Sequence, residues 1–66
     1  MKCIINGDNF TFDRALSIQE VIQELDLDET RMIVEHNEQL IQREQFSKYK
    51  VTDDDRLELL EFVGGG

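Results

Sequence analysis

One short stretch of the sequence has a helical pattern, and it limits the folds that the chain can adopt. Ser17 and Glu20 form a capping box, because each side chain can accept a hydrogen bond from a backbone N–H at a helix start. Apolar residues then recur at helical spacing, at Ile18, Val21, Ile22 and Leu25. The pattern predicts one helix of about two turns that ends near Asp26 and has a single apolar stripe.

The segments on either side of this helix have strand patterns. Residues 2–6 are apolar and β-branched, and they run into Asn6-Gly7. An Asn-Gly pair between two strand-like runs favours a tight hairpin, because both residues accept a positive φ. The second run, residues 9–13, alternates with period two and places Phe10 and Phe12 on one face. We therefore expect an antiparallel hairpin at the start of the chain.

Two further strands are predicted at residues 31–37 and 56–63, and the charged turn at residues 53–55 is expected to be solvated. A helix between two strands must pack on the sheet that those strands form. With this order of elements, 66 residues predict an α+β fold, the β-grasp or ubiquitin-like arrangement, in which a small mixed sheet packs on one main helix. We expect one domain in residues 1–63, followed by a flexible C-terminal glycine tail at residues 64–66.

The last predicted strand has more apolar side chains than one face can bury. Leu57 and Leu59 share one face, and Leu60 and Phe62 share the other. A single helix covers a single face, so we expect Leu57 and Leu59 in the core. Leu60 and Phe62 should then be at least partly exposed and form a patch that contacts a partner. The alternative is a β-bulge or a local cover over this face.

Composition excludes several kinds of function. Fifteen acidic and seven basic residues give a formal net charge of −8, so nucleic acids and anionic membrane surfaces would repel the chain. The single cysteine, Cys3, excludes an internal disulfide and is predicted to be a buried, inert thiol. His36 has no visible metal partners, and no motif indicates a catalytic or metal site. No apolar run approaches membrane-spanning length, so we expect a cytoplasmic protein with no bound cofactor.

Three of the four glycines, Gly64, Gly65 and Gly66, follow the last predicted strand. Glycine has no Cβ, so such a segment is either slack or suited to threading into a narrow channel of another protein. Together with three other segments, these residues give the whole chain a resemblance to the ubiquitin-like sulfur carrier proteins, and within them to the ThiS family of thiamine biosynthesis. The four segments are MKCIINGDNFTF, SIQEVIQEL, VEHNEQLIQREQF and FVGGG.

The resemblance implies a protein substrate and sulfur carrier that partner enzymes act on, not an enzyme. A ThiF-type adenylyltransferase would use ATP and magnesium to adenylate the carboxylate of Gly66. Sulfur from a donor enzyme, such as a cysteine desulfurase, would convert this group to a thiocarboxylate, and a ThiG-type thiazole synthase would receive the sulfur. Gly64 and Gly65 would thread the tail into the active sites of these partners.

Other functions stay open at this point. The small subunit of molybdopterin synthase, MoaD, uses the same chemistry, but the short chain and the REQF segment at residues 43–46 favour the thiamine branch by resemblance. A ubiquitin-like modifier would instead be joined to lysines of target proteins. A plain interaction domain would not use its glycine tail at all.

Overall fold

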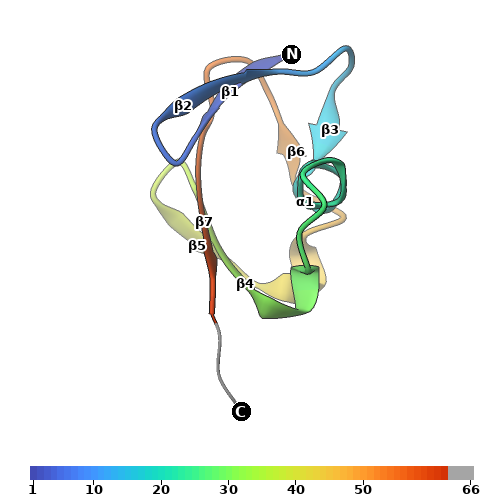
Figure 1. The fold of residues 1–66 in the computed structure, drawn as a ribbon, viewed down its shortest axis with the longest axis vertical. Coiled ribbons are helices and arrows are strands. Elements are labelled where there is room, and N and C mark those ends of the chain that lie inside the picture. The colour runs from blue at the N-terminus through green and yellow to red at the C-terminus, as the bar shows by residue number, and fades with distance from the viewer. Residues whose placement is uncertain (63–66) are drawn as a thin grey trace.

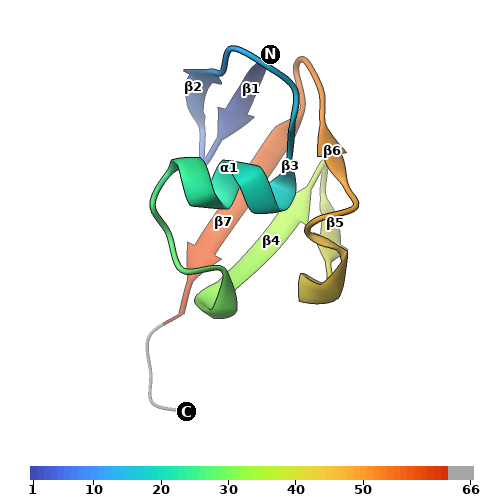
Figure 2. The ribbon, with the colours of Figure 1, turned by 90° about the vertical axis from the view of Figure 1, so that its right-hand side faces the viewer.

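The computed structural model describes residues 1–62, in which one helix crosses a five-stranded mixed sheet (Figures 1 and 2). The sheet order is β2-β1-β7-β4-β5, in which β1 and β7 are parallel and the other neighbours are antiparallel. The strands are β1 Lys2–Ile5, β2 Asp8–Thr11, β3 Leu16–Ser17, β4 Met32–His36, β5 Gln39–Ile41, β6 Lys50–Val51 and β7 Arg56–Glu61. The helices are α1 Ile18–Glu24 and the short 3-10 helices η1 Glu29–Arg31 and η2 Arg43–Gln45. The predicted α+β arrangement, a small mixed sheet on one main helix, is confirmed.

The turn at Asn6-Gly7 joins β1 to β2 and also fixes this hairpin to the central strand. Asn6 and Gly7 have φ values of 51° and 86°, as a two-residue type I′ turn requires. The Asn6 side chain accepts a hydrogen bond from the Leu59 N–H at 2.8 Å and donates one to the Leu59 carbonyl at 3.1 Å. The predicted hairpin is confirmed, and its turn residue also fixes the position of β7.

Helix α1 begins with the predicted capping box. The Ser17 hydroxyl accepts from the Glu20 N–H at 3.1 Å, and the Glu20 carboxylate accepts from the Ser17 N–H at 2.8 Å. The helix ends slightly earlier than predicted, at Glu24, and Asp26 takes a positive φ of 60° just beyond it. Three stripe residues are fully buried against the sheet, namely Ile18, Val21 and Ile22.

The hydrophobic core fills the space between α1 and one face of the sheet. Leu57 and Leu59 belong to it, as predicted, and so does Cys3, whose thiol is buried. Burial, and next the charge of Asp55, raises the pKa of the Cys3 thiol, which fits the predicted inert role. The two-stranded sheet of β3 and β6, which was not predicted from the sequence, also contributes Leu16 and Val51 to this core.

Two predictions concern the chain's end and its location. The predicted tail at residues 64–66, and Val63 at the end of the predicted domain, lie outside the described residues. Within residues 1–62 no helix is long and apolar enough to cross a membrane. The cytoplasmic location stays a prediction.

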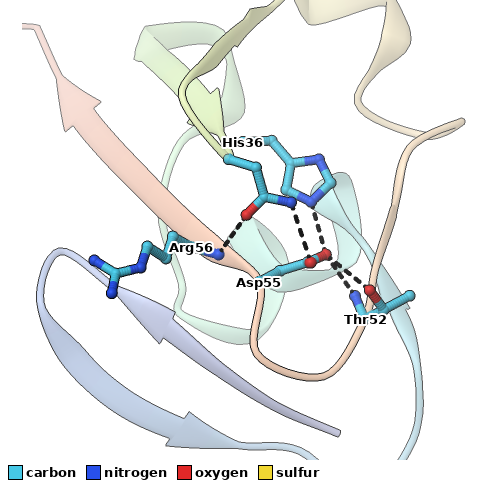
Figure 3. A network of polar contacts seen from close by, with 5 residues as sticks. His36, Thr52, Asp55 and Arg56 are labelled. Carbon is cyan, nitrogen blue, oxygen red and sulfur yellow. Dashed lines mark hydrogen bonds and ion pairs between the residues drawn. The ribbon is translucent and has the colours of Figure 1, made fainter.

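Asp55 is the centre of a polar network at the start of β7 (Figure 3). Its Oδ2 lies 2.8 Å from His36 Nε2 at the end of β4 and accepts from the Thr52 N–H and hydroxyl at 2.8 and 3.1 Å. Its Oδ1 accepts from the Asn37 side-chain N–H at 3.1 Å, and the side-chain Oδ1 of Asn37 accepts from the Arg56 N–H at 2.9 Å. The network therefore joins the β4–β5 turn to the β6–β7 turn.

This network corrects the expectation of a solvated turn at residues 53–55. The side chain of Asp55 is only 13% exposed, and so is that of His36. Burial opposes ionisation of Asp55, but the hydrogen bonds from His36, Thr52 and Asn37 outweigh it and lower the pKa of this carboxyl to about 2. The expectation was wrong for Asp55, because hydrogen-bond donors from two turns converge on its carboxylate. The adjacent Asp54 is exposed.

Replacing Asp55 by asparagine should destabilise the protein and reduce its sensitivity to acid. The folded-state pKa lies below the ordinary value of 3.8, so the stabilisation is complete above about pH 4 and is lost as the pH falls towards 2. We expect the free energy of unfolding at neutral pH to fall by on the order of 1 to 2 kcal/mol. Urea unfolding across this pH range measures both effects.

Asp54→Asn is the matched control, because Asp54 is exposed and its φ of 70° suits asparagine. It should unfold like the parent at every pH. Equal stability of the Asp55→Asn variant and this control would show that the network does not stabilise the fold.

Candidate functional site

The sheet face opposite α1 carries exposed apolar side chains. In Figure 1, α1, β3 and β6 lie on the same side of the sheet. The strands alternate, so β4 and β7 bury Val34 and Leu59 on that side and direct their alternate residues to the other. Four residues on this other side form what we call the apolar patch: Ile33, Leu40, Leu60 and Phe62, which are 42%, 61%, 64% and 49% exposed.

The sheet register brings the patch together beside the end of the central strand. Ile33 and Leu60 are directly opposite each other in the antiparallel pairing of β4 with β7. The Phe62 N–H donates to the Arg31 carbonyl at 2.9 Å, so backbone pairing continues past the end of β7. Phe62 is the last described residue, so the patch includes the end of the described chain.

A hollow of about 500 Å³ lies at one side of the patch. Ile33, Leu40 and Phe62 line it, and Arg43 and Glu44 of η2 contribute polar groups. Such a surface can receive apolar side chains of another protein while its charged rim stays hydrated. The hollow and the apolar patch therefore form a candidate docking surface, as predicted for Leu60 and Phe62.

The structure describes only some of the site residues that the sequence predicted. Leu60 and Phe62 are exposed as predicted, without a local cover from residues 1–62, and their contact with a partner stays a prediction. Gly64, Gly65 and Gly66 lie outside the described residues. Within the described part of the chain, no group of three or more His, Cys, Asp or Glu side chains could hold a metal ion.

Two patch residues, Ile33 and Leu40, were not predicted from the sequence. Ile33 lies between the buried Met32 and Val34, so the alternation of the predicted strand at 31–37 was the signal that placed it outward. Leu40 had a weaker signal, because β5 has only three residues and its partner strand had to be known first.

Comparisons with known proteins agree with the fold and extend over nearly the whole chain. The sequence pattern of the ThiS family matches residues 3–66. A crystal structure of the thiamine biosynthesis protein ThiS from Geobacter metallireducens superposes with a TM-score of 0.85, is 33% identical and covers 100% of both chains. This structural likeness confirms the predicted β-grasp fold.

Two curated relatives differ in how much of their own length matches this chain. The sulfur carrier protein ThiS of Bacillus subtilis is 34% identical over 50 residues, which cover 76% of each chain. A protein of Paramagnetospirillum magneticum named thiazole synthase is 32% identical over 66 residues. That match covers 100% of this chain but only 20% of the thiazole synthase, so the chain spans about a fifth of that relative.

Placing a charge on the apolar patch should weaken partner binding more than stability. Leu60→Glu and Phe62→Glu each replace an apolar side chain that is about half exposed or more with a carboxylate. The folded protein therefore loses little buried apolar surface. We expect melting temperatures close to that of the parent and clearly weaker complex formation with the partner enzymes. Thermal melting and titration calorimetry on the same samples measure the two effects.

Leu59→Glu is the contrasting variant, because Leu59 is buried on the other face of the same strand. It should unfold the protein or lower its melting temperature strongly. If Leu60→Glu and Phe62→Glu unfold in the same way, those two residues belong to the core and the assignment of the faces is wrong.

Proposed function

Because the chain belongs to the ThiS family, the sulfur carrier proteins of thiamine biosynthesis, we propose that its C-terminal carboxylate carries the sulfur. The carboxylate of Gly66 is adenylated, converted to a thiocarboxylate and presented to a thiazole synthase. The chain is thus a substrate of other enzymes and is not itself an enzyme. The observation that carries the proposal is the family match, which extends through the glycines to residue 66.

The chemistry explains why the carboxylate has to be activated first. A carboxylate is a poor electrophile, so one of its oxygens attacks the α-phosphorus of ATP, and pyrophosphate leaves. The resulting acyl adenylate has AMP as a good leaving group, which sulfur mobilised from cysteine then displaces. The magnesium ion and ATP belong to the adenylating enzyme. Water would hydrolyse the adenylate, so this step requires a closed site that excludes solvent.

The fold supplies a fixed base for the segment that enters such a site. Strand β7 pairs with β1 on one edge and with β4 on the other, and the Phe62–Arg31 hydrogen bond extends this pairing. Residues 64–66, when extended, would reach roughly 10 Å beyond the domain. Glycine adds no Cβ, so Gly64 and Gly65 allow a narrow channel to close around the chain.

The proposed partners are a ThiF-type adenylyltransferase, a sulfur donor such as a cysteine desulfurase, and a ThiG-type thiazole synthase. The Paramagnetospirillum protein named thiazole synthase supports the last of these, because a segment resembling this whole chain is part of it. A net charge of −8 argues against nucleic acid and anionic membranes as partners. We place these reactions in the cytoplasm.

Removing Gly66 should nearly abolish adenylation. The deletion moves the reactive carboxylate back by one residue, about 3.5 Å, and an error near 1 Å in a positioned reactant can already slow a reaction on the order of 100-fold. Gly66→Val keeps the carboxylate at the same distance along the chain but places a branched side chain against the channel wall, so it should also fail. AMP–pyrophosphate exchange by the adenylating enzyme, with each variant as substrate, measures the effect.

Both variants should melt like the parent, because neither change touches the core formed by residues 3–59. Circular dichroism melts are the control for folding. Normal exchange with the shortened chain would overturn the proposal, because the reactive group would then not be the carboxylate of Gly66.

A further inference from the structure

Two glutamates lie side by side on the sheet face opposite α1. Glu35 of β4 and Glu58 of β7 are directly opposite each other in the antiparallel register, and both are exposed. Residues in such positions have Cβ atoms about 4.5 to 5.5 Å apart, and like charges there are destabilising. The two side chains therefore start from neighbouring positions on this face. We call Glu35 and Glu58 the acidic pair.

No basic side chain of the described part of the chain forms an ion pair with the acidic pair. Within residues 1–62 the ion pairs join Asp13 to Arg14 and Asp28 to Arg31, and Asp55 is hydrogen-bonded to His36. Arg56 precedes Glu58 by two residues on the same face of β7, yet it forms no ion pair with either glutamate. The acidic pair is open to a cation from outside the domain.

The acidic pair continues directly into the apolar patch. Leu40 lies opposite Glu35 on one side, in the pairing of β4 with β5. Two residues further along the strands, Ile33 lies opposite Leu60. One continuous face therefore combines an apolar area with two adjacent negative charges, next to the point where residues 63–66 begin.

The charges and the apolar surface of this face limit which molecules can bind to it. A second copy of the chain meeting this face with its own would bring four carboxylates together, in a molecule whose net charge is already −8. A complementary surface is apolar and presents one cation above the acidic pair. Arginine suits this position, because its planar guanidinium has five N–H donors and can bind both carboxylates.

We propose that Glu35 and Glu58 together bind an arginine or lysine side chain of the enzyme that docks on the apolar patch and receives the tail. This inference rests on the proposed function, because it assigns the partner surface in that reaction. Binding of the cation removes the repulsion between the two glutamates, so the acidic pair favours the complex over the free carrier.

The test compares two double variants that change the net charge equally. Glu35→Gln/Glu58→Gln removes the acidic pair, whereas Glu24→Gln/Asp26→Asn removes two exposed charges at the end of α1, on the other side of the sheet. Titration calorimetry measures the affinity of each variant for the adenylating enzyme and for the thiazole synthase at low and at physiological salt. Thermal melting of the free variants is measured alongside.

For Glu35→Gln/Glu58→Gln we expect affinity for at least one of the two enzymes to fall about tenfold or more, with a weaker dependence on salt. Its melting temperature should equal or exceed that of the parent, because the repulsion is relieved. The control should keep the parent's affinity within about threefold, since only long-range steering is reduced.

Parent-like affinity of Glu35→Gln/Glu58→Gln for both enzymes would overturn the inference and leave the proposed function standing. Equal weakening of both double variants would also overturn it, because the effect would come from net charge and not from a local site. If the parent binds but supports no adenylation, the proposed function fails separately, and the affinities still decide the inference. A parent that binds neither enzyme would overturn both.

Discussion

The central position of β7 determines the geometry of the whole domain. This strand is parallel to β1 on one edge and antiparallel to β4 on the other, and so it joins the first hairpin to the second. Side-chain hydrogen bonds hold this strand at two points. Asp55, which directly precedes β7, bonds with side chains at the β4–β5 turn, and the Asn6 side chain bonds with the backbone of Leu59 within β7. Strand β7 is therefore held by neighbouring strands on both sides.

A single short helix covers only one face of this sheet, and the exposed apolar patch on the other face follows from that fact. Helix α1 buries the Leu57 and Leu59 side of β7, and the alternation of the strand leaves Leu60 outward. Exposed apolar side chains and the adjacent Glu35 and Glu58 contribute little to the stability of the free domain. In the proposed complexes, a partner surface would bury the former and neutralise the latter. The same sheet thus supports the core on one face and carries the proposed docking surface on the other.

Local signals in the sequence predicted much of this architecture, and long-range contacts account for what was missed. The Asn6-Gly7 turn and the Ser17–Glu20 capping box are each specified by neighbouring residues, so they were predicted correctly. The role of Asp55 depends on His36, nineteen residues away, and no local pattern connects the two. The strands β3 and β6 have only two residues each, which is too short for an alternation to be visible.

The same distinction applies to the candidate site. The exposure of Leu60 and Phe62 followed from strand periodicity, whereas their grouping with Leu40 required the strand order. The proposed role of Gly66 rests on the family and on chemistry.

The most direct test of this role is the intact mass of the protein after incubation with the adenylating enzyme, ATP, magnesium and a sulfur source. We predict the mass increase of one oxygen replaced by sulfur, located at Gly66 by fragmentation. An unchanged mass in the presence of active enzyme, or a linkage of the chain to lysines of other proteins, would contradict the account.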